Sequence, residues 1–230
     1  MMEGSSPTSQ HQMHLSRRKR LEAIQLTIQL SFPLIKEYGF SRETLARSVL
    51  TLPEPPSAPL SDTAVNALFG EGDSARRTLI NAWLDEGRAQ MRLTPAESIS
   101  EVLAGRLRYN EPVLSLLPEA FALLASPRSG LPPLDARPAL RHATTIADDA
   151  CHIVGDASVG HSWYTRRASI ATVYVAAELH QMSSPETALQ FLGSLLRSTT
   201  TLESAVAETS LFAEYVAKSW KGIIKSSGMV

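Results

Sequence analysis

The sequence predicts an all-α protein of about ten helices, and three observations lead to this prediction. From Leu21 onward, apolar residues recur at spacings of three and four, the period of an amphipathic helix. No segment alternates apolar and polar residues with the Val, Ile and aromatic content of a strand. Glycine, proline and helix-capping residues separate the periodic segments. A hydrophobic content of 43% with 20% charged residues suits a folded globular chain.

Charge and cysteine content exclude several classes of protein. The chain has 22 Lys and Arg against 23 Asp and Glu, so its net charge of -1 provides no overall field for a phosphate backbone. Its one cysteine, Cys151, rules out an internal disulfide and a thiolate-rich metal site. No window reaches the roughly 18 consecutive apolar residues of a membrane-spanning helix. We therefore expect no nucleic-acid binding, and membrane contact only at the bilayer surface.

The sequence divides the chain into four parts. Residues 1–16 contain one acidic residue, Glu3, and precede a basic cluster at 17–20. We expect a disordered tail there, with a mitochondrial presequence remnant as the alternative. The other three parts are an N-terminal subdomain at 17–72, a helical body at 73–200 and a C-terminal amphipathic helix at 201–226.

Three short helices are predicted in the N-terminal subdomain, at 16–38, 42–50 and 62–69. The first should be interrupted by Pro33 and end at Gly39, a residue that tolerates the left-handed conformation beyond a helix. Ser41 is placed to cap the second, and a proline-rich connector precedes the third. Three short helices before a larger helical body are the outline of a helix-turn-helix regulator.

Two features of this subdomain argue against DNA binding. The connector holds four prolines between residues 53 and 59, which makes it too long and stiff for a turn of about three or four residues. The third helix, at 62–69, contains no Lys or Arg, and Asn66 is its one side chain suited to a base edge. We therefore predict a degenerate helix-turn-helix.

Further helices are predicted at 73–91, 94–109, 113–125, 139–154, 163–181 and 185–197. Thr94, with Pro95 in the first turn, is the expected start of one of them, and Pro118 is expected to kink another. The proline-rich stretch at 126–138 cannot be helical and is the expected hinge between two halves of the molecule.

The body offers one candidate for catalysis. Asp148, His152 and Asp156 are spaced four apart and would share a face of a continuous helix, where they could bind a metal in a helical enzyme. Gly155 interrupts that helix and further ligands are lacking, so a solvated polar face with a cap is favoured. Cys151 is expected to pack as a small side chain. We expect no catalytic residue, metal or cofactor.

The predicted C-terminal helix has an apolar face and a cationic end. Packing against the body is the default interpretation of such a face, but cations beside an aromatic residue also suit an interfacial helix on an anionic bilayer. The residues expected to contact lipid or membrane are Phe212, Val216, Lys218, Trp220, Lys221, Ile223, Ile224 and Lys225.

The most distinctive stretch runs from Asp148 to Ser158 and continues with Trp163-Tyr164-Thr165-Arg166-Arg167-Ala168. It resembles the accessory lipid-binding family of ubiquinone biosynthesis, the ninth of the coenzyme Q series. The shared features are an Asp-rich helix, a Gly-Asp-x-Ser turn and a Trp-Tyr-Thr-Lys/Arg-Arg helix start. The likeness extends more faintly over 17–225. Cys151 stands where the family usually has Trp, and 160–162 replace Asp-Phe-Asn, which indicates a divergent member of the kind expected in a fungus.

The resemblance implies a TetR-type fold that has lost DNA binding and has a hydrophobic pocket for an isoprenoid quinone or phospholipid. It implies a peripheral protein on the matrix side of the mitochondrial inner membrane, in contact with anionic, cardiolipin-containing lipid. Such a protein is not an enzyme. It presents a polyprenyl-quinone intermediate to the di-iron demethoxyubiquinone hydroxylase and meets other ubiquinone-synthesis proteins.

Under this resemblance, the residues expected to bind the partner are Asp156, Trp163 and Tyr164. The aromatic pair follows a loop at a helix start, where large exposed side chains are typical interface anchors. Arg166 and Arg167 are expected to pair with carboxylates of the preceding helix. A homodimer is left open. The alternative function for the whole protein is that of a TetR-like transcriptional regulator that senses an apolar ligand.

Overall fold

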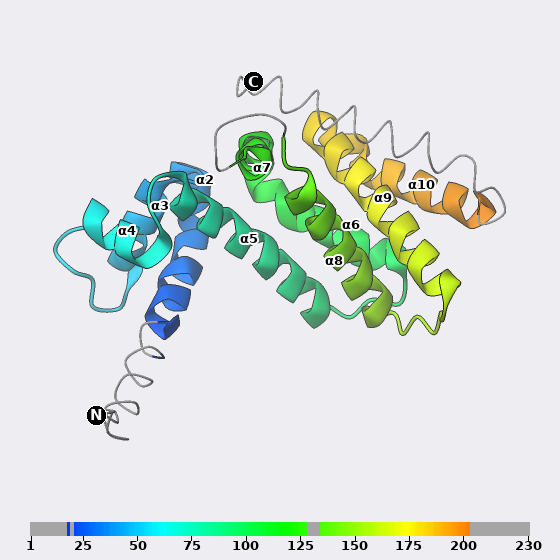
Figure 1. Ribbon diagram of the computed structural model, residues 1–230, viewed down its shortest axis with the longest axis horizontal. Helices are drawn as coiled ribbons and strands as arrows, with labels where there is room; N and C mark the ends of the chain where they lie inside the picture. Colours follow the sequence, from blue (N-terminus) through cyan, green and yellow to red (C-terminus); the bar gives the residue numbers. More distant parts are fainter. Residues whose placement is uncertain (1–17, 19–20, 128–133, 203–230) are drawn as a thin grey trace, which may run out of the picture. The chain divides into compact units, whose positions relative to one another are not determined.

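The computed structural model describes residues 18, 21–127 and 134–202, and these residues form helices and loops without a strand (Figure 1). This confirms the predicted all-α class. The helices after the helical residues 21–31 are α2 (Ile35–Tyr38), α3 (Arg42–Arg47), α4 (Asp62–Phe69), α5 (Asp73–Leu93), α6 (Ile99–Asn110), α7 (Leu117–Ala125), α8 (Arg137–Ile153), α9 (His161–Ser183) and α10 (Ala188–Leu202). Across the described ranges, no helix has the length and apolar content to cross a membrane.

The chain forms two compact units that divide after Ala82, inside α5. The sequence placed a boundary before α5, between residues 72 and 73. The first turns of α5 belong to the first unit because they bond to it: Arg76 Nε donates to the Phe40 carbonyl at 3.0 Å, and Thr78 Oγ1 donates to the Phe69 carbonyl at 3.0 Å.

Local signals set the helices of the first unit. Pro33 lies in a 3-10 segment, Phe32–Leu34, that interrupts the helix as predicted, and Gly39 ends α2 with φ at 68°. Ser41 caps α3, its Oγ accepting from the Thr44 N–H at 3.2 Å. The predicted second helix is shorter than expected, because after Arg47 it continues as the 3-10 segment Ser48–Thr51.

Helix α4 corresponds to the predicted third helix in both of its bounds. Its candidate base-reading residue, Asn66, is engaged inside the unit: Arg42 Nη2 donates to the Asn66 Oδ1 at 2.7 Å and to the Asp62 Oδ1 at 3.2 Å. A side chain held in this way is poorly placed to read a base edge. The geometry therefore disfavours the regulator interpretation.

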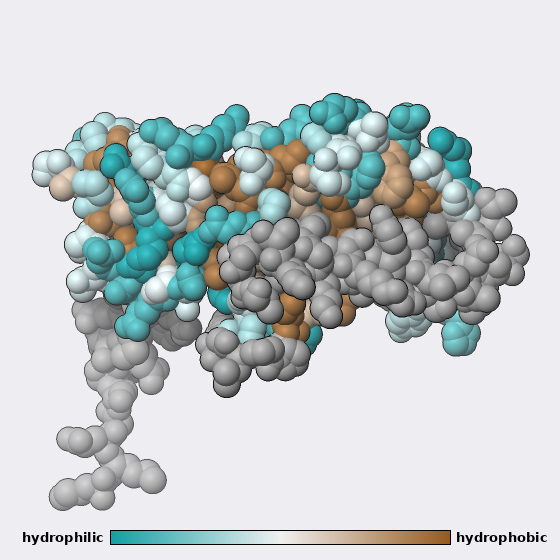
Figure 2. All heavy atoms as spheres, turned by 90° about the horizontal axis from the view of Figure 1, so that it is seen from above, coloured by the Kyte–Doolittle hydropathy of each residue, from teal (hydrophilic) through white to brown (hydrophobic). Residues whose placement is uncertain are grey.

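The second unit is arranged around α9. Helix α9 packs against α8, α10 and α6, and it runs antiparallel to α8 (Figure 1). The core between them includes Leu103, Leu107, Ile146, Ala150 and Tyr174, all inaccessible to solvent. Burying each large apolar side chain contributes about 1.5–3 kcal/mol. Figure 2 shows one face of the molecule, where apolar side chains in brown lie among hydrophilic ones in teal.

The predicted start of the helix after α5 was wrong. Helix α6 begins at Ile99, and its cap is Ser98, whose Oγ accepts from the Glu101 N–H at 3.3 Å. Thr94 instead closes α5, its Oγ1 donating to the Gln90 carbonyl at 2.9 Å. Capping by a side-chain acceptor thus decides the boundary over a proline that is merely permitted there.

The prolines after α6 have two different effects. Pro118 separates the 3-10 segment Glu111–Leu116 from α7, which agrees with the predicted interruption. The stretch at 126–138 is not a hinge between halves, because α7 and α8 lie in the same unit and pack together. A backbone hydrogen bond of 2.8 Å from the Asp135 N–H to the Ala125 carbonyl ties this stretch to the end of α7.

Helix α10 extends beyond its predicted end at residue 197 to Leu202, without the predicted break before residue 201. The rest of the predicted C-terminal helix, with all eight of its expected lipid-contacting residues from Phe212 to Lys225, lies outside the described residues.

Candidate functional site

An exposed aromatic pair opens α9. Trp163 and Tyr164 lie in its first turn, three and four residues after Gly160, whose φ of 62° turns the chain into the helix. Their rings pack edge to face with centroids 4.7 Å apart, and the residues are 37% and 69% exposed. Val159, just before the helix, is 79% exposed. Trp163 and Tyr164, together with the apolar Val159, are called the aromatic surface. The exposure expected for the aromatic pair is confirmed.

Arg167 holds the Trp163 ring in place. Its guanidinium carbon lies 4.1 Å from the centroid of the Trp163 ring, a cation–π contact. Its Nε donates to the Asp148 Oδ1 at 2.7 Å, and its Nη1 lies 3.3 Å from the Asp156 Oδ2. The expected pairing of the arginines with carboxylates of the preceding helix is thereby confirmed for Asp148. The two carboxylates fix Arg167, and Arg167 fixes the indole.

Asp156 lies behind the arginines. Its side chain is 7% exposed and its Oδ1 lies 3.1 Å from the Arg166 Nε. The Ser158 hydroxyl donates to the Asp156 Oδ2, and this bond, together with the two arginines, keeps the pKa of Asp156 below its usual value. Asp156 was expected to bind the partner directly. The structure brings it together with Trp163 through Arg167 but leaves its carboxylate little surface for a direct contact.

The candidate metal-binding face of Asp148, His152 and Asp156, which the sequence did not favour, does not converge. Asp148 and Asp156 are bound to arginines, and α8 ends at Ile153, before Gly155. Gly155, at a φ of 68°, turns the chain away from the helix axis, as its position in the sequence indicated. No group of three or more His, Cys, Asp or Glu residues suited to a metal occurs among the residues that the structure describes.

Cys151 packs in the core. It is fully buried, and burial raises the pKa of its thiol. This confirms the expected packing role, since a thiol with a raised pKa is a poor nucleophile.

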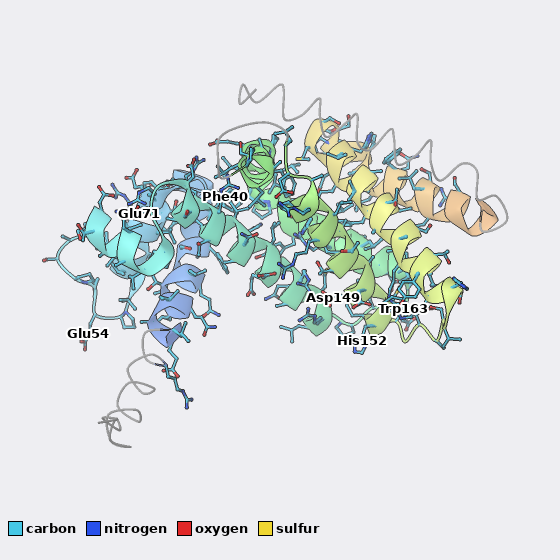
Figure 3. The ribbon with its side chains drawn as sticks, viewed as in Figure 1. Phe40, Glu54, Glu71, Asp149, His152 and Trp163 are labelled. Atoms are coloured by element: carbon cyan, nitrogen blue, oxygen red, sulfur yellow. The ribbon has the colours of Figure 1, made fainter. Side chains whose placement is uncertain are left out.

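A second ion-pair cluster, which the sequence did not reveal, ties α5 to α8. Asp149 accepts from the Arg88 Nε at 2.7 Å and lies 3.0 Å from the Arg92 Nη2. Figure 3 shows Asp149 and His152 on α8 at the same end of the α8–α9 pair as Trp163. Arg92 and Arg88 lie 57 and 61 residues before Asp149, so no local sequence pattern predicts these ion pairs.

The most unexpected feature is a polar cluster inside the second unit, called the Glu178 cluster. Glu178 on α9 is 1% exposed, and its Oε1 accepts from the Tyr174 hydroxyl at 2.6 Å and from the Asn110 Nδ2 at 2.9 Å. The His142 Nε2 on α8 lies 3.4 Å from the same oxygen. Arg106 completes the cluster, its Nη1 donating to the Asn110 Oδ1 at 2.6 Å.

The contacts within the Glu178 cluster determine which of its groups are ionised. Burial by itself would raise the pKa of Glu178, but its interactions with His142, Arg106 and Tyr174 outweigh burial and lower the pKa to about 2. Burial raises the pKa of Tyr174 well above its usual value, so its hydroxyl remains a donor. Arg106 is fully buried, and its Nε and Nη2 have no hydrogen-bond partner among the described residues.

A small cavity adjoins the Glu178 cluster. Its volume is about 10 Å³, room for about one water molecule. It is lined by Leu84, Phe121, Leu124, Ala125, Pro138, Ala139 and His142. The His142 ring lies between those of Phe121 and Tyr174, at centroid distances of 6.0 and 5.9 Å. His142 therefore belongs to both the cavity wall and the polar cluster.

Comparison with known proteins bears on α8, α9 and most of α10. Residues 136–200 match the family model described as COQ9. Residues 136–200 are thus similar to a COQ9 domain. This segment contains the aromatic surface, Asp156 and three members of the Glu178 cluster, namely His142, Tyr174 and Glu178. The similarity confirms the family resemblance read from the Asp148–Ser158 and Trp163–Ala168 segments.

Proteins named COQ9 are similar to this chain over stretches longer than residues 136–200. The chain is 33% identical over 129 residues to the mitochondrial ubiquinone biosynthesis protein COQ9 of Drosophila melanogaster, covering 54% of this chain and 37% of that protein. The protein of that name from Bos taurus is 31% identical over 180 residues, covering 70% of this chain and 51% of its own length. The Homo sapiens protein is 29% identical over 177 residues, with coverages of 70% and 51%. The chain thus spans about half the length, or less, of these relatives.

Proposed function

We propose that the protein acts in ubiquinone biosynthesis as a non-enzymatic lipid-binding protein, which presents a polyprenyl-quinone intermediate to the di-iron demethoxyubiquinone hydroxylase. The similarity of residues 136–200 to a COQ9 domain supports this role, as do relatives whose names specify ubiquinone biosynthesis and mitochondria. The proposed location is the matrix side of the mitochondrial inner membrane. The observation that carries the proposal is the exposed Trp163–Tyr164 pair inside that segment.

The aromatic surface has the properties of a docking site. Exposed Trp and Tyr side chains are enriched among the residues that dominate binding energy at protein interfaces. The Trp163 ring is already ordered by Arg167, which is itself ion-paired to Asp148 and Asp156. Ordering before binding lowers the entropy cost of association. A partner can therefore bind a preformed surface.

The charged groups around this surface support positioning rather than chemistry. Asp148, Asp149 and Asp156 each interact with at least one arginine, so their carboxylates are used to orient side chains. A general base needs a carboxylate that can reach the proton of a substrate. We assign the oxidation step to the partner, and the holding and orienting of the lipid to this protein.

The C-terminal residues supply the membrane contact in this proposal. The apolar and cationic residues from Phe212 to Lys225 would lie on anionic, cardiolipin-containing lipid, where aromatic and basic side chains bind together. Contact with other ubiquinone-synthesis proteins is part of the same proposal, and a homodimer is compatible with it.

Trp163→Lys tests the docking role in cells that lack the gene. We expect the variant to fold, because Trp163 is partly exposed and loses mainly a cation–π contact, yet to bind the hydroxylase at least about ten-fold more weakly. Co-purification with the hydroxylase measures binding, and mass spectrometry of quinones should show accumulated demethoxy-ubiquinone with depleted ubiquinone.

Leu140→Lys is the matched control. It introduces the same charge at an apolar residue that is 63% exposed, on α8 near its start rather than beside α9's first turn. This control should restore ubiquinone as wild type does. The proposal fails if the gene deletion leaves the quinone profile normal, or if a stable Trp163→Lys protein still co-purifies at the wild-type level.

A further inference from the structure

We propose that the cavity beside the Glu178 cluster receives the ring hydroxyl of a phenol or quinol, with His142 as its hydrogen-bond partner. Glu178 acts as the residue that orients His142. The inference rests on the proposed function, since it names the part of the lipid ligand that this unit recognises and the side chain that recognises it.

The composition of the cavity wall is the first support. Six of its seven lining residues are apolar and one, His142, is polar. Small-molecule sites have this form, an apolar lining with a few placed polar groups that fix the ligand's orientation. A purely hydrocarbon ligand would gain nothing from an imidazole in the wall.

The two nitrogens of His142 have different surroundings. Nε2 faces the Glu178 carboxylate at 3.4 Å, whereas Nδ1 has no hydrogen bond to any part of the chain that the structure describes. With Nε2 carrying the proton toward Glu178, Nδ1 accepts in neutral imidazole and donates in imidazolium. A hydroxyl group both donates and accepts, so it pairs with Nδ1 in either state, which a carbonyl group does not.

The polar groups behind His142 fix its orientation. Glu178 is held by hydrogen bonds from Tyr174 and Asn110, and Arg106 holds Asn110 in turn. A carboxylate behind a histidine sets both its ring orientation and its tautomer. Burying five polar or charged side chains in a helical core costs free energy that hydrogen bonds and ion pairs only partly offset, which indicates a use for the cluster beyond stability. Orientation of one histidine toward a cavity is such a use.

The size of the cavity agrees with a single oxygen atom. Its volume of about 10 Å³ accommodates one water-sized group and not a six-membered ring. The hydroxyl would therefore fill the cavity, while the ring would have to displace side chains of the cavity wall, such as Phe121 and Leu124. Both side chains belong to α7, next to the connection that leads to α8.

A pair of probes that differ by one oxygen tests the proposal: 4-hexylphenol and hexylbenzene, titrated into the full chain by calorimetry. Wild type should prefer the phenol over hexylbenzene more strongly than His142→Gln does, by about ten-fold or more. The Gln amide nitrogen takes the place of Nε2 toward Glu178, so this variant keeps that contact and loses the acceptor at Nδ1. Hexylbenzene affinity should change by less than about two-fold.

His152→Gln is the matched control, because His152 is an exposed residue of the same helix. It should keep the wild-type preference. In the unmodified protein, the ¹⁵N shifts of the His142 ring should move on addition of 4-hexylphenol and stay in place with hexylbenzene. This second measurement requires no variant to fold.

Equal phenol preference in wild type and His142→Gln, or no shift of the His142 ring, would overturn the assignment and leave the cavity as a site for water only. That failure is distinct from failure of the proposed function. A normal quinone profile in the deletion strain would contradict quinone presentation, whereas the phenol preference is measured on purified protein.

Discussion

Glu178 is an ionised carboxylate enclosed by α6, α8 and α9, and its depressed pKa makes the stability of the fold depend on pH. The pKa falls from 4.5 to about 2 on folding, so ionised Glu178 stabilises the folded state above pH 4.5. This contribution, about 3 kcal/mol, is lost as the pH falls from 4.5 toward 2. Glu178→Gln removes it, so the difference in unfolding free energy between wild type and variant should narrow over that interval.

Urea unfolding at several pH values measures this difference. Glu186→Gln serves as the control, since Glu186 is exposed and its replacement should leave the pH profile of stability unchanged. If the difference between wild type and Glu178→Gln stays constant from pH 5 to pH 2, Glu178 does not hold a depressed pKa.

Residues with local patterns could be predicted, and residues with distant partners could not. The exposed Trp163–Tyr164 pair and the pairing of Arg167 with Asp148 follow from a short motif. The Glu178 cluster joins residues 36 and 68 positions apart, which no spacing rule connects. One signal was present: Glu178 is the one residue outside the hydrophobic class between Val173 and Leu179, where a charge requires buried partners.

At the scale of the helix, the approach of α5 to α6 depends on Gly87. A Cβ atom there would lie 2.8 Å from the Tyr109 Cδ1 and 2.9 Å from the Arg106 Cζ, closer than packing allows. Arg106 is fully buried, so the shift that the added Cβ forces would have to be taken up inside the packed unit. Gly87→Ala should therefore destabilise the protein by about 1–3 kcal/mol, despite the better helix propensity of alanine.

Gly105→Ala is the matched control on α6, because no atom lies within 4 Å of the added Cβ. It should stabilise the protein by about 0.5–1 kcal/mol, the difference in helix propensity. Chemical denaturation of both variants measures the two effects. A stabilised Gly87→Ala protein would show that α5 and α6 can separate at no cost.

Helix boundaries were predictable where one signal acted alone. Ser41 and Pro33 had no competitor, and the structure agrees with both. At the start of α6 two signals lay close together, Thr94-Pro95 and Ser98 with Glu101 three residues later. The second is favoured because its side chains satisfy free backbone N–H groups, from Glu101 to the Ser98 Oγ and from Glu97 to the Glu101 Oε2.

For the whole molecule, the all-α class followed from periodicity, but the division into units did not. That division depends on contacts such as Arg76 to the Phe40 carbonyl, 36 residues apart, which bind the first turns of α5 to the first unit. A boundary drawn from sequence falls at a break between helices. The chain instead divides inside a continuous helix.

In the proposed function, membrane binding depends on the C-terminal residues of the chain. A chain ending at Leu202 should lose most of its sedimentation with cardiolipin-containing liposomes, because it lacks the apolar and cationic residues from Phe212 to Lys225. Replacing Lys218, Lys221 and Lys225 by Gln in the full chain should weaken binding to anionic liposomes and have little effect on neutral ones. Undiminished pelleting of the shortened chain would place the membrane contact elsewhere.

The burial of Cys151 makes the chain suitable for site-specific labelling. It is the sole cysteine, it is closed to solvent, and burial raises the pKa of its thiol. A thiol introduced at Tyr164, which is 69% exposed, would therefore react with a spin label or fluorophore far ahead of the native one. Reaction of Cys151 itself then requires the core to open, so the native sequence carries its own chemical reporter of unfolding.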